Sequence, residues 1–253
     1  MSKKALLFCF AALASAGGMT KRKRNLLIQI GVAVAGLTVM ALIGLSGARG
    51  VRADDDDEGA KVQRGFLIAP VPLNLAGKDR ALVGLGSYIV NAQADCNGCH
   101  SAGPPTEFLP AGNPYLLSPP LGPFTGKKTI NPATYLGGNR DFGAYPAAPF
   151  PHIISRNLTP DKTGLPEGGH TLAEFKQIIR TGVDMDHLHP TCTHGPDGQC
   201  IPAPFDGSRL QIMPWSAFQD MTDHDLEAIY EYLKAIPCVA GPPAPDPRHN
   251  DCH

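Results

Sequence analysis

The sequence predicts a mainly α-helical domain with long loops rich in proline and glycine. Segments near 80–95, 171–182 and 222–236 each place apolar residues at helical spacing. The 253 residues include 28 glycines and 25 prolines, which favours short helices and many turns. No stretch alternates strand and helix as a βαβ unit would. A hydrophobic fraction of 43% excludes a wholly disordered chain, and the length suits one domain or at most two.

The first predicted helix runs from near Arg80 to Asp95 in the stretch "DRALVGLGSYIVNAQADC". Six apolar side chains share one face of it: Leu82, Val83, Leu85, Tyr88, Ile89 and Ala92. Gly84 and Gly86 lower its helix propensity. Either a second helix approaches closely at these glycines, or the helix is simply weak.

The other two predicted helices carry recognisable start and stop signals. Thr171 and Glu174 form a capping box before the middle helix, and Gly182 ends it. Thr222 is the expected N-cap of the last helix, and Pro237 ends that helix. Apolar residues three and four positions apart give each helix a face to bury.

The segment 1–53 is typical of a leader for export. Basic residues at Lys21–Arg24 precede an apolar run from Leu26 to Leu45, and Val51-Arg52-Ala53 resembles a cleavage site with small residues. The same run is long enough to serve as an uncleaved membrane anchor. Both interpretations predict an exported protein of the bacterial periplasm, either soluble or anchored to the inner membrane.

Charge is distributed unevenly along the chain. Residues 1–53 hold eight of the 22 Lys and Arg and none of the 23 Asp and Glu, so 54–253 has a net charge of −9. An acidic body argues against nucleic acid as a partner and allows a partner with a basic docking surface. The segment 54–79 opens with the acidic run Asp54–Glu58 and is predicted to be mostly extended.

The stretch "NAQADCNGCHSAG" places Cys96, Cys99 and His100 together. A C-x-x-C pair serves as a redox dithiol, as half of a zinc site or as a haem attachment site. A dithiol of the thioredoxin type would need a βαβ pattern, and zinc would need a second pair at suitable spacing. C-x-x-C-H is the pattern of covalent haem attachment, in which two thiols bind the porphyrin and the adjacent imidazole binds the iron. The motif occurs once and predicts one covalently bound haem c.

Four cysteines remain in the body of the chain: Cys192, Cys200, Cys238 and Cys252. They fall into two local pairs whose loops contain Gly or Pro, and exported proteins keep disulfides. We therefore predict the short-loop pairing, Cys192 with Cys200 and Cys238 with Cys252. A zinc site built from these cysteines and nearby histidines is the alternative.

A haem iron bound by His100 has a sixth position to fill. Met213 lies in the loop "LQIMPWSAFQDM" just before the last helix, where Pro214 stiffens the chain. A thioether at this position raises the reduction potential and blocks small ligands. The remaining candidates are one methionine and three histidines: Met185, His187, His189 and His194. Met221 directly precedes the helix cap and is expected to pack in the core.

Three stretches together resemble class I c-type cytochrome domains: "GSYIVNAQADCNGCH", "SRNLTPDKTGLPEGGHTLAEFKQIIRTG" and "MPWSAFQDMTDHDLEAIYEYLKAIP". They are similar to cytochrome subunits of membrane-bound alcohol and gluconate dehydrogenases. The resemblance covers about 80–100 and 153–237. It implies a small α bundle whose first and last helices cross, haem in the cleft between them, and Met213 as the distal ligand. The chain departs from the family in a Pro- and Gly-rich insertion at about 101–152 and in having one haem motif rather than three.

The predicted function is that of an exported single-haem cytochrome that carries electrons between redox proteins. A dehydrogenase subunit and a terminal oxidase are the expected kinds of partner, and no catalytic residue is needed. The domain that does this spans 80–253, and Arg156 and Asn157 within it could bind the haem propionates. The alternative is a haem enzyme such as a peroxidase, or a ligand sensor, with an open iron site. Carbon monoxide binding by the reduced protein would separate the two.

Overall fold

The structure is a computed structural model. It describes residue 21 and the ranges 50–115, 128–186, 189–193, 198–244, 246 and 248–253. Most of the predicted leader, together with His187 and His194, lies outside these residues. Contacts divide the chain into two units, 1–57 and 58–253, and the second unit contains every feature described below except the first residues of α3.

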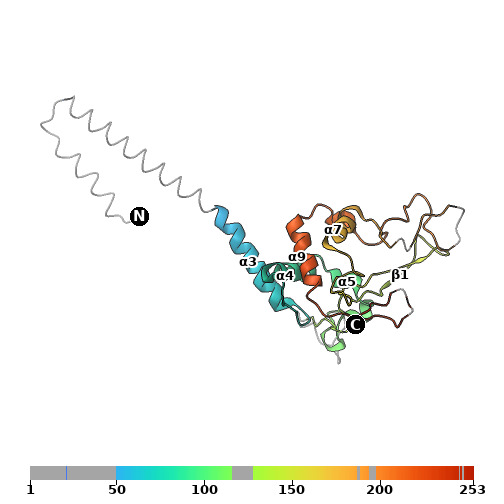
Figure 1. The fold of residues 1–253 in the computed structure, drawn as a ribbon, viewed down its shortest axis with the longest axis horizontal. Helices are drawn as coiled ribbons and strands as arrows, with labels where there is room; N and C mark the ends of the chain where they lie inside the picture. The colour runs from blue at the N-terminus through green and yellow to red at the C-terminus, as the bar shows by residue number, and fades with distance from the viewer. Residues whose placement is uncertain are drawn as a thin grey trace. The chain divides into compact units, whose positions relative to one another are not determined.

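Short helices, long connections and one two-stranded sheet make up the described chain (Figure 1). In chain order the elements are α3 (Gly50–Ile68), α4 (Arg80–Tyr88), the π-helical turn η1 (Ile89–Gln93), α5 (Cys96–His100), α6 (Pro104–Glu107), the 3₁₀ turn η2 (Pro110–Gly112), β1 (Asp141–Ala144), β2 (His152–Ile154), α7 (Leu172–Thr181), α8 (Trp215–Phe218) and α9 (Asp223–Leu233). The strands β1 and β2 are antiparallel, with an irregularity in register between Asp141 and Ala144.

All three predicted helices are present, and their caps explain their boundaries. The Asp79 side chain accepts hydrogen bonds from the first turn of α4, which continues through η1. Thr171 and Glu174 form the complete capping box of α7, and Gly182 ends that helix with φ 68°. Thr222 caps α9 as expected. Helix α9 ends at Leu233, a few residues before the proline that was predicted to end it.

The prediction that 54–79 is mostly extended is wrong for its first part, because α3 continues to Ile68. The reason is packing on α4. A Cβ added to Gly65 would lie 1.9 Å from the Gly84 carbonyl oxygen, so the two backbones touch. A Cβ added to Gly84 would in turn lie 2.7 Å from side-chain atoms of both Val62 and Phe66 on α3. The boundary predicted between residues 53 and 54 falls inside this helix.

Helices α4 and α9 cross (Figure 1), and a second glycine lies where they touch. A Cβ on Gly86 would lie 1.9 Å from the Ala228 carbonyl oxygen and 2.8 Å from the Tyr232 Cβ. Both glycines of α4 are therefore explained by the close approach of a neighbouring helix. The crossing buries one apolar core drawn from α4, η1, α7 and α9: Val83, Leu85, Ile89, Val90, Phe175, Ile179, Leu226, Ile229, Tyr230 and Leu233.

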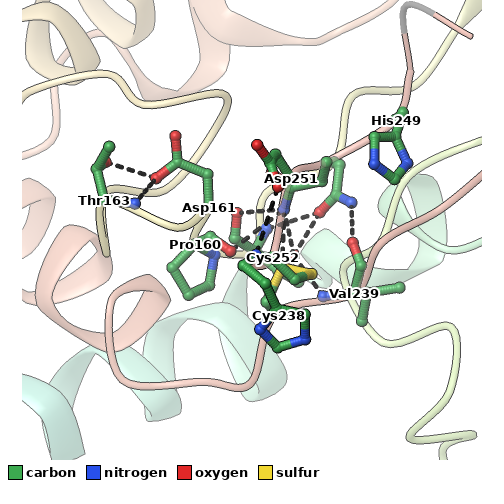
Figure 2. Close-up of a disulfide and its surroundings, with 12 residues drawn as sticks. Pro160, Asp161, Thr163, Cys238, Val239, His249, Asp251 and Cys252 are labelled. Atoms are coloured by element: carbon green, nitrogen blue, oxygen red, sulfur yellow. Dashed lines mark hydrogen bonds between the residues drawn. A yellow bond between two sulfur atoms is a disulfide. The ribbon is translucent and has the colours of Figure 1, made fainter. Parts of the chain in front are cut away.

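Two disulfides close the loops that the sequence predicted, Cys192–Cys200 and Cys238–Cys252. Figure 2 shows the second of them next to Pro160 and Asp251, where the C-terminal tail meets the 157–163 loop. Asn250 joins the two segments, because its side-chain amide donates to the carbonyl oxygen of Pro160. The tail thus fixes a loop that begins directly after Arg156.

No helix in the described part of the chain is both long enough and apolar enough to cross a membrane.

Candidate haem site

One apolar cavity brings together the four side chains that the sequence predicted as haem ligands and attachment points. Cys96, Cys99, His100 and Met213 all line it. It encloses about 1190 Å³ of atom-free space, including the part open to solvent. Aliphatic and aromatic residues of η1, α7 and α9 form the remaining wall, among them Val90, Phe175, Ile178, Ile179, Leu226, Ile229 and Leu233. A macrocycle with an apolar face and a need for dry surroundings fits such a wall.

The attachment segment α5 is held by residues 136–140, which belong to the inserted region. Asn97 is buried, and its side-chain oxygen accepts a hydrogen bond from the Leu136 amide at 3.0 Å. The Gly138 amide donates to the His100 carbonyl at 2.8 Å, and the Arg140 guanidinium donates to the Gly98 carbonyl. The inserted region therefore fixes the C-x-x-C-H segment through hydrogen bonds made outside the cavity.

The imidazole of His100 is oriented for binding an iron. Its Nδ1 lies 2.8 Å from the carbonyl oxygen of Arg156. A carbonyl only accepts, so Nδ1 carries the proton and the neutral ring leaves Nε2 free to act as a ligand. Burial lowers the pKa of His100, and the Arg156 guanidinium acts in the same direction, so the neutral form is favoured.

The two thiols of the motif do not resemble a redox dithiol. Cys96 and Cys99 are the free cysteines of the described chain. Burial raises the pKa of the Cys96 thiol to about 12, and the Asp95 carboxylate adds to the effect. Catalytic dithiols work through a thiolate with a lowered pKa. Among the described residues, no group of three or more His, Cys, Asp and Glu could hold a metal ion.

Met213 reaches the cavity from a loop that is tied to the end of α7. The Leu210 amide donates to the Gly182 carbonyl at 2.8 Å, and the indole of Trp215 donates to the Leu210 carbonyl. A Cβ on Gly182 would lie 2.2 Å from the Trp215 ring, so the indole packs directly on that glycine. Trp215 thus positions the Met213 loop and does not line the cavity.

The alternative distal ligands are placed differently. Met185 and His189 do not line the apolar cavity. His189 lines a second, polar cavity next to it. Met221, which the sequence predicted as a core residue, packs against the core and also lines the apolar cavity. His187 and His194 lie outside the described residues.

The side chains of Arg156 and Asn157 are already engaged. The guanidinium of Arg156 pairs with Asp184 and Asp186. The Asn157 amide donates to the Val239 carbonyl at 2.6 Å and its oxygen accepts from Thr159, so it builds the loop rather than facing the cavity. Arg156 lines both cavities, and the suggestion that this pair binds propionates stays a prediction.

Comparison with known proteins finds three relatives, each 28% identical to the chain. The fructose dehydrogenase cytochrome subunit of Gluconobacter japonicus aligns over 159 residues, 62% of this chain and 22% of that protein. Cytochrome c subunits of quinone alcohol dehydrogenases from Gluconacetobacter polyoxogenes and Komagataeibacter europaeus align over 167 residues, 65% of this chain and 24% of theirs. No protein-family model and no solved structure matches.

The chain is thus similar to cytochrome subunits of dehydrogenases, and it spans about a quarter of their length or less. By their names these relatives are the cytochrome subunits of the dehydrogenases. This agrees with the prediction of an electron-transfer subunit rather than an enzyme.

Sequence reasoning did not identify three residues that shape this region. Asn97 and Arg140 grip the attachment segment, and Glu167 places a buried carboxyl in the wall of the cavity. The first lies inside the motif at a position that the motif leaves variable. The other two lie in loops, where no local pattern marks them.

Proposed function

We propose that the protein is an exported c-type cytochrome with a single haem, built on a class I cytochrome fold, that carries electrons between redox proteins. One observation carries the proposal: two free thiols, an imidazole with Nε2 unprotonated and a thioether meet in one apolar cavity. Cys96 and Cys99 would bind the haem covalently, and His100 and Met213 would be its axial ligands. When bound, the haem supplies a site that accepts and releases one electron.

The chain's own residues account for the rest of that task. The Arg156 carbonyl keeps the His100 ring in one tautomer and one orientation. A methionine at the other position leaves no open site, so small ligands are excluded and the reduced state is favoured. The apolar walls keep water away from the centre. No residue is required to make or break bonds in a substrate.

We infer that the partner is a dehydrogenase or a terminal oxidase, and that the protein works in the periplasm. The similarity to dehydrogenase cytochrome subunits favours the first partner. The net charge of −9 over 54–253 suits a partner with a basic docking surface. Two disulfides fit an oxidising compartment. The leader at 1–53 would direct export, and it would be either removed or kept as an anchor.

The proposal is tested by expressing the chain in a host that attaches haem to exported cytochromes. Haem should remain with the denatured polypeptide in the wild type and be lost when both Cys96 and Cys99 are replaced by alanine. One haem per chain and no binding of carbon monoxide by the reduced protein are expected. Carbon monoxide binding would instead indicate an enzyme or sensor with an open iron, and a chain without covalent haem would refute the proposal.

Export is tested on the same preparation. N-terminal sequencing of the mature protein should begin at Asp54. A start before Leu26 would show that the apolar run is retained as an anchor.

A further inference from the structure

Glu167 is a buried residue with an unpartnered carboxyl oxygen and a strained backbone. It lies in the turn before α7, and only 7% of its surface is exposed. Its Oε2 atom has no hydrogen-bond partner among the described residues. Its backbone is in the left-handed region, with φ 54°, which residues other than glycine seldom adopt. Buried, unpartnered and strained side chains are concentrated at functional positions.

The carboxyl of Glu167 stands between two cavities. It lines the apolar cavity of the proposed haem and also the polar cavity beside it. Ile154, Ser155 and Arg156 are the other residues common to both. The polar cavity reaches exposed residues such as Arg248 and His249. The Glu167 carboxyl can therefore interact with a charge in the apolar cavity and exchange a proton with solvent through the polar cavity.

The charged groups that act on Glu167 are Arg156, Asp184 and Asp186, and they affect its ionisation in opposite directions. Arg156 favours the charged carboxylate, but its guanidinium is already paired with Asp184 and Asp186. Those two carboxylates disfavour a third negative charge. Burial is the largest influence, and it raises the pKa of Glu167 to about 7. The remaining titratable groups on the polar cavity or beside the turn are His152, His170, His189, Asp246, Arg248 and His249.

We propose that Glu167 is a proton-binding site coupled to the electron in the adjacent cavity, an inference that rests on the proposed function. As one electron enters the site from a redox donor, the Glu167 carboxylate takes up one proton from solvent through the polar cavity. When the electron leaves for an acceptor, the proton returns to solvent. One negative and one positive charge enter and leave together, so the net charge of the region is unchanged.

The physical reason is repulsion between like charges across a medium of low dielectric constant. A negative charge added to the cavity disfavours the nearby carboxylate, so Glu167 binds its proton more tightly in the reduced protein. The reduction potential must then fall with rising pH over the range in which Glu167 is ionised only in the oxidised protein. Full coupling changes the reduction equilibrium tenfold per pH unit, which for one electron is about 59 mV.

The experiment measures the reduction potential of the haem-loaded protein between pH 5 and pH 9. The wild type should show a falling segment that begins near neutral pH. Glu167→Gln keeps the size and shape of the side chain, and it should hold the potential at the acidic plateau of the wild type throughout this segment. A flat wild-type profile, or an unchanged slope in Glu167→Gln, would overturn the inference while leaving the proposed function intact.

Two control variants separate Glu167 from other sources of pH dependence. Glu227→Gln on α9 removes the same charge from a partly exposed side chain that lines neither cavity, and it should keep the falling segment. His189→Gln removes a titrating group from the polar cavity and should keep it as well. Loss of the slope in His189→Gln with its retention in Glu167→Gln would assign the proton to the histidine and refute the inference.

An infrared measurement decides the question if Glu167→Gln does not fold. The difference spectrum between reduced and oxidised wild type should show a protonated carboxyl gained on reduction. Its absence would overturn the inference. Failure of the wild-type chain to bind haem at Cys96 and Cys99 would instead refute the proposed function, and the inference with it.

Discussion

Replacing Gly86 with alanine tests whether the crossing of α4 and α9 builds the cavity. The added Cβ would lie 1.9 Å from the Ala228 carbonyl oxygen and 2.5 Å from the Ala228 carbonyl carbon. These are backbone atoms of a helix, so they cannot turn aside as the end of a flexible side chain can. The two helices must move apart.

Two opposing contributions set the size of the effect. Alanine in a helix interior is favoured over glycine by about 0.5–1 kcal/mol. Overpacking in a well-packed core costs about 1–3 kcal/mol, and an overlap with backbone belongs at the upper end of that range. We therefore expect Gly86→Ala to lower the free energy of unfolding by roughly 2 kcal/mol. Since α9 supplies Leu226, Ile229 and Leu233 to the cavity wall, haem incorporation should fall too.

Urea unfolding of the haem-loaded protein measures the effect, and α3 offers a matched control. Gly59 is also a helical glycine, and a Cβ there meets nothing within 4 Å. Gly59→Ala should therefore stabilise the protein by about 0.5–1 kcal/mol. The two substitutions are chemically identical and should act in opposite directions. A Gly86→Ala protein as stable as the wild type would show that the helices do not touch at this point.

Three further changes follow from the structure. Met213→Ala should remove the weak sulfur-to-iron absorption of the oxidised protein, lower its reduction potential and admit carbon monoxide. Met185→Ala should do none of these. An unchanged spectrum in Met213→Ala would reject Met213 as the ligand. Because the pKa of Glu167 is raised from 4.5 to about 7, the wild type should lose up to ~3 kcal/mol of stability as pH rises through that interval. Glu167→Gln should remove this loss, which urea unfolding at pH 4.5 and 7.5 measures. The same pH dependence in wild type and variant would contradict the prediction. Replacing Cys238 and Cys252 with serine should cost about 3 kcal/mol for a loop of this length; no change in stability, or free thiols in peptide maps of the wild type, would contradict the disulfide.

The helices that carry the cavity could be predicted because their signals are local. Periodicity located α4, α7 and α9, and the caps at Thr171 and Thr222 set two of their starts. The helix α3 could not be predicted in the same way. Its sequence contains the acidic run Asp54–Glu58 and has little amphipathic pattern. What makes it helical in the structure is contact with Gly84, a residue of another element.

In the candidate site, too, the features with a local sequence signal could be predicted and those that depend on tertiary contacts could not. The spacing of Cys96, Cys99 and His100 alone predicts covalent haem attachment. The carbonyl that orients His100 belongs to Arg156, and the groups that grip α5 belong to residues 136–140. Which groups become partners depends on how the loops pack in three dimensions. Every residue has a backbone carbonyl, so the sequence does not show which one will bind His100.

Arg156 joins the two sides of the proposed haem. Its carbonyl accepts the hydrogen bond of His100, while its guanidinium pairs with Asp184. The Asp184 amide in turn donates to the Ser208 carbonyl at 2.7 Å, at the start of the loop that carries Met213. The two proposed ligands come from distant parts of the chain, yet they are linked through one partly buried residue. Because an electron carrier works best when its ligands move little between oxidation states, a shared anchor of this kind serves the proposed function directly.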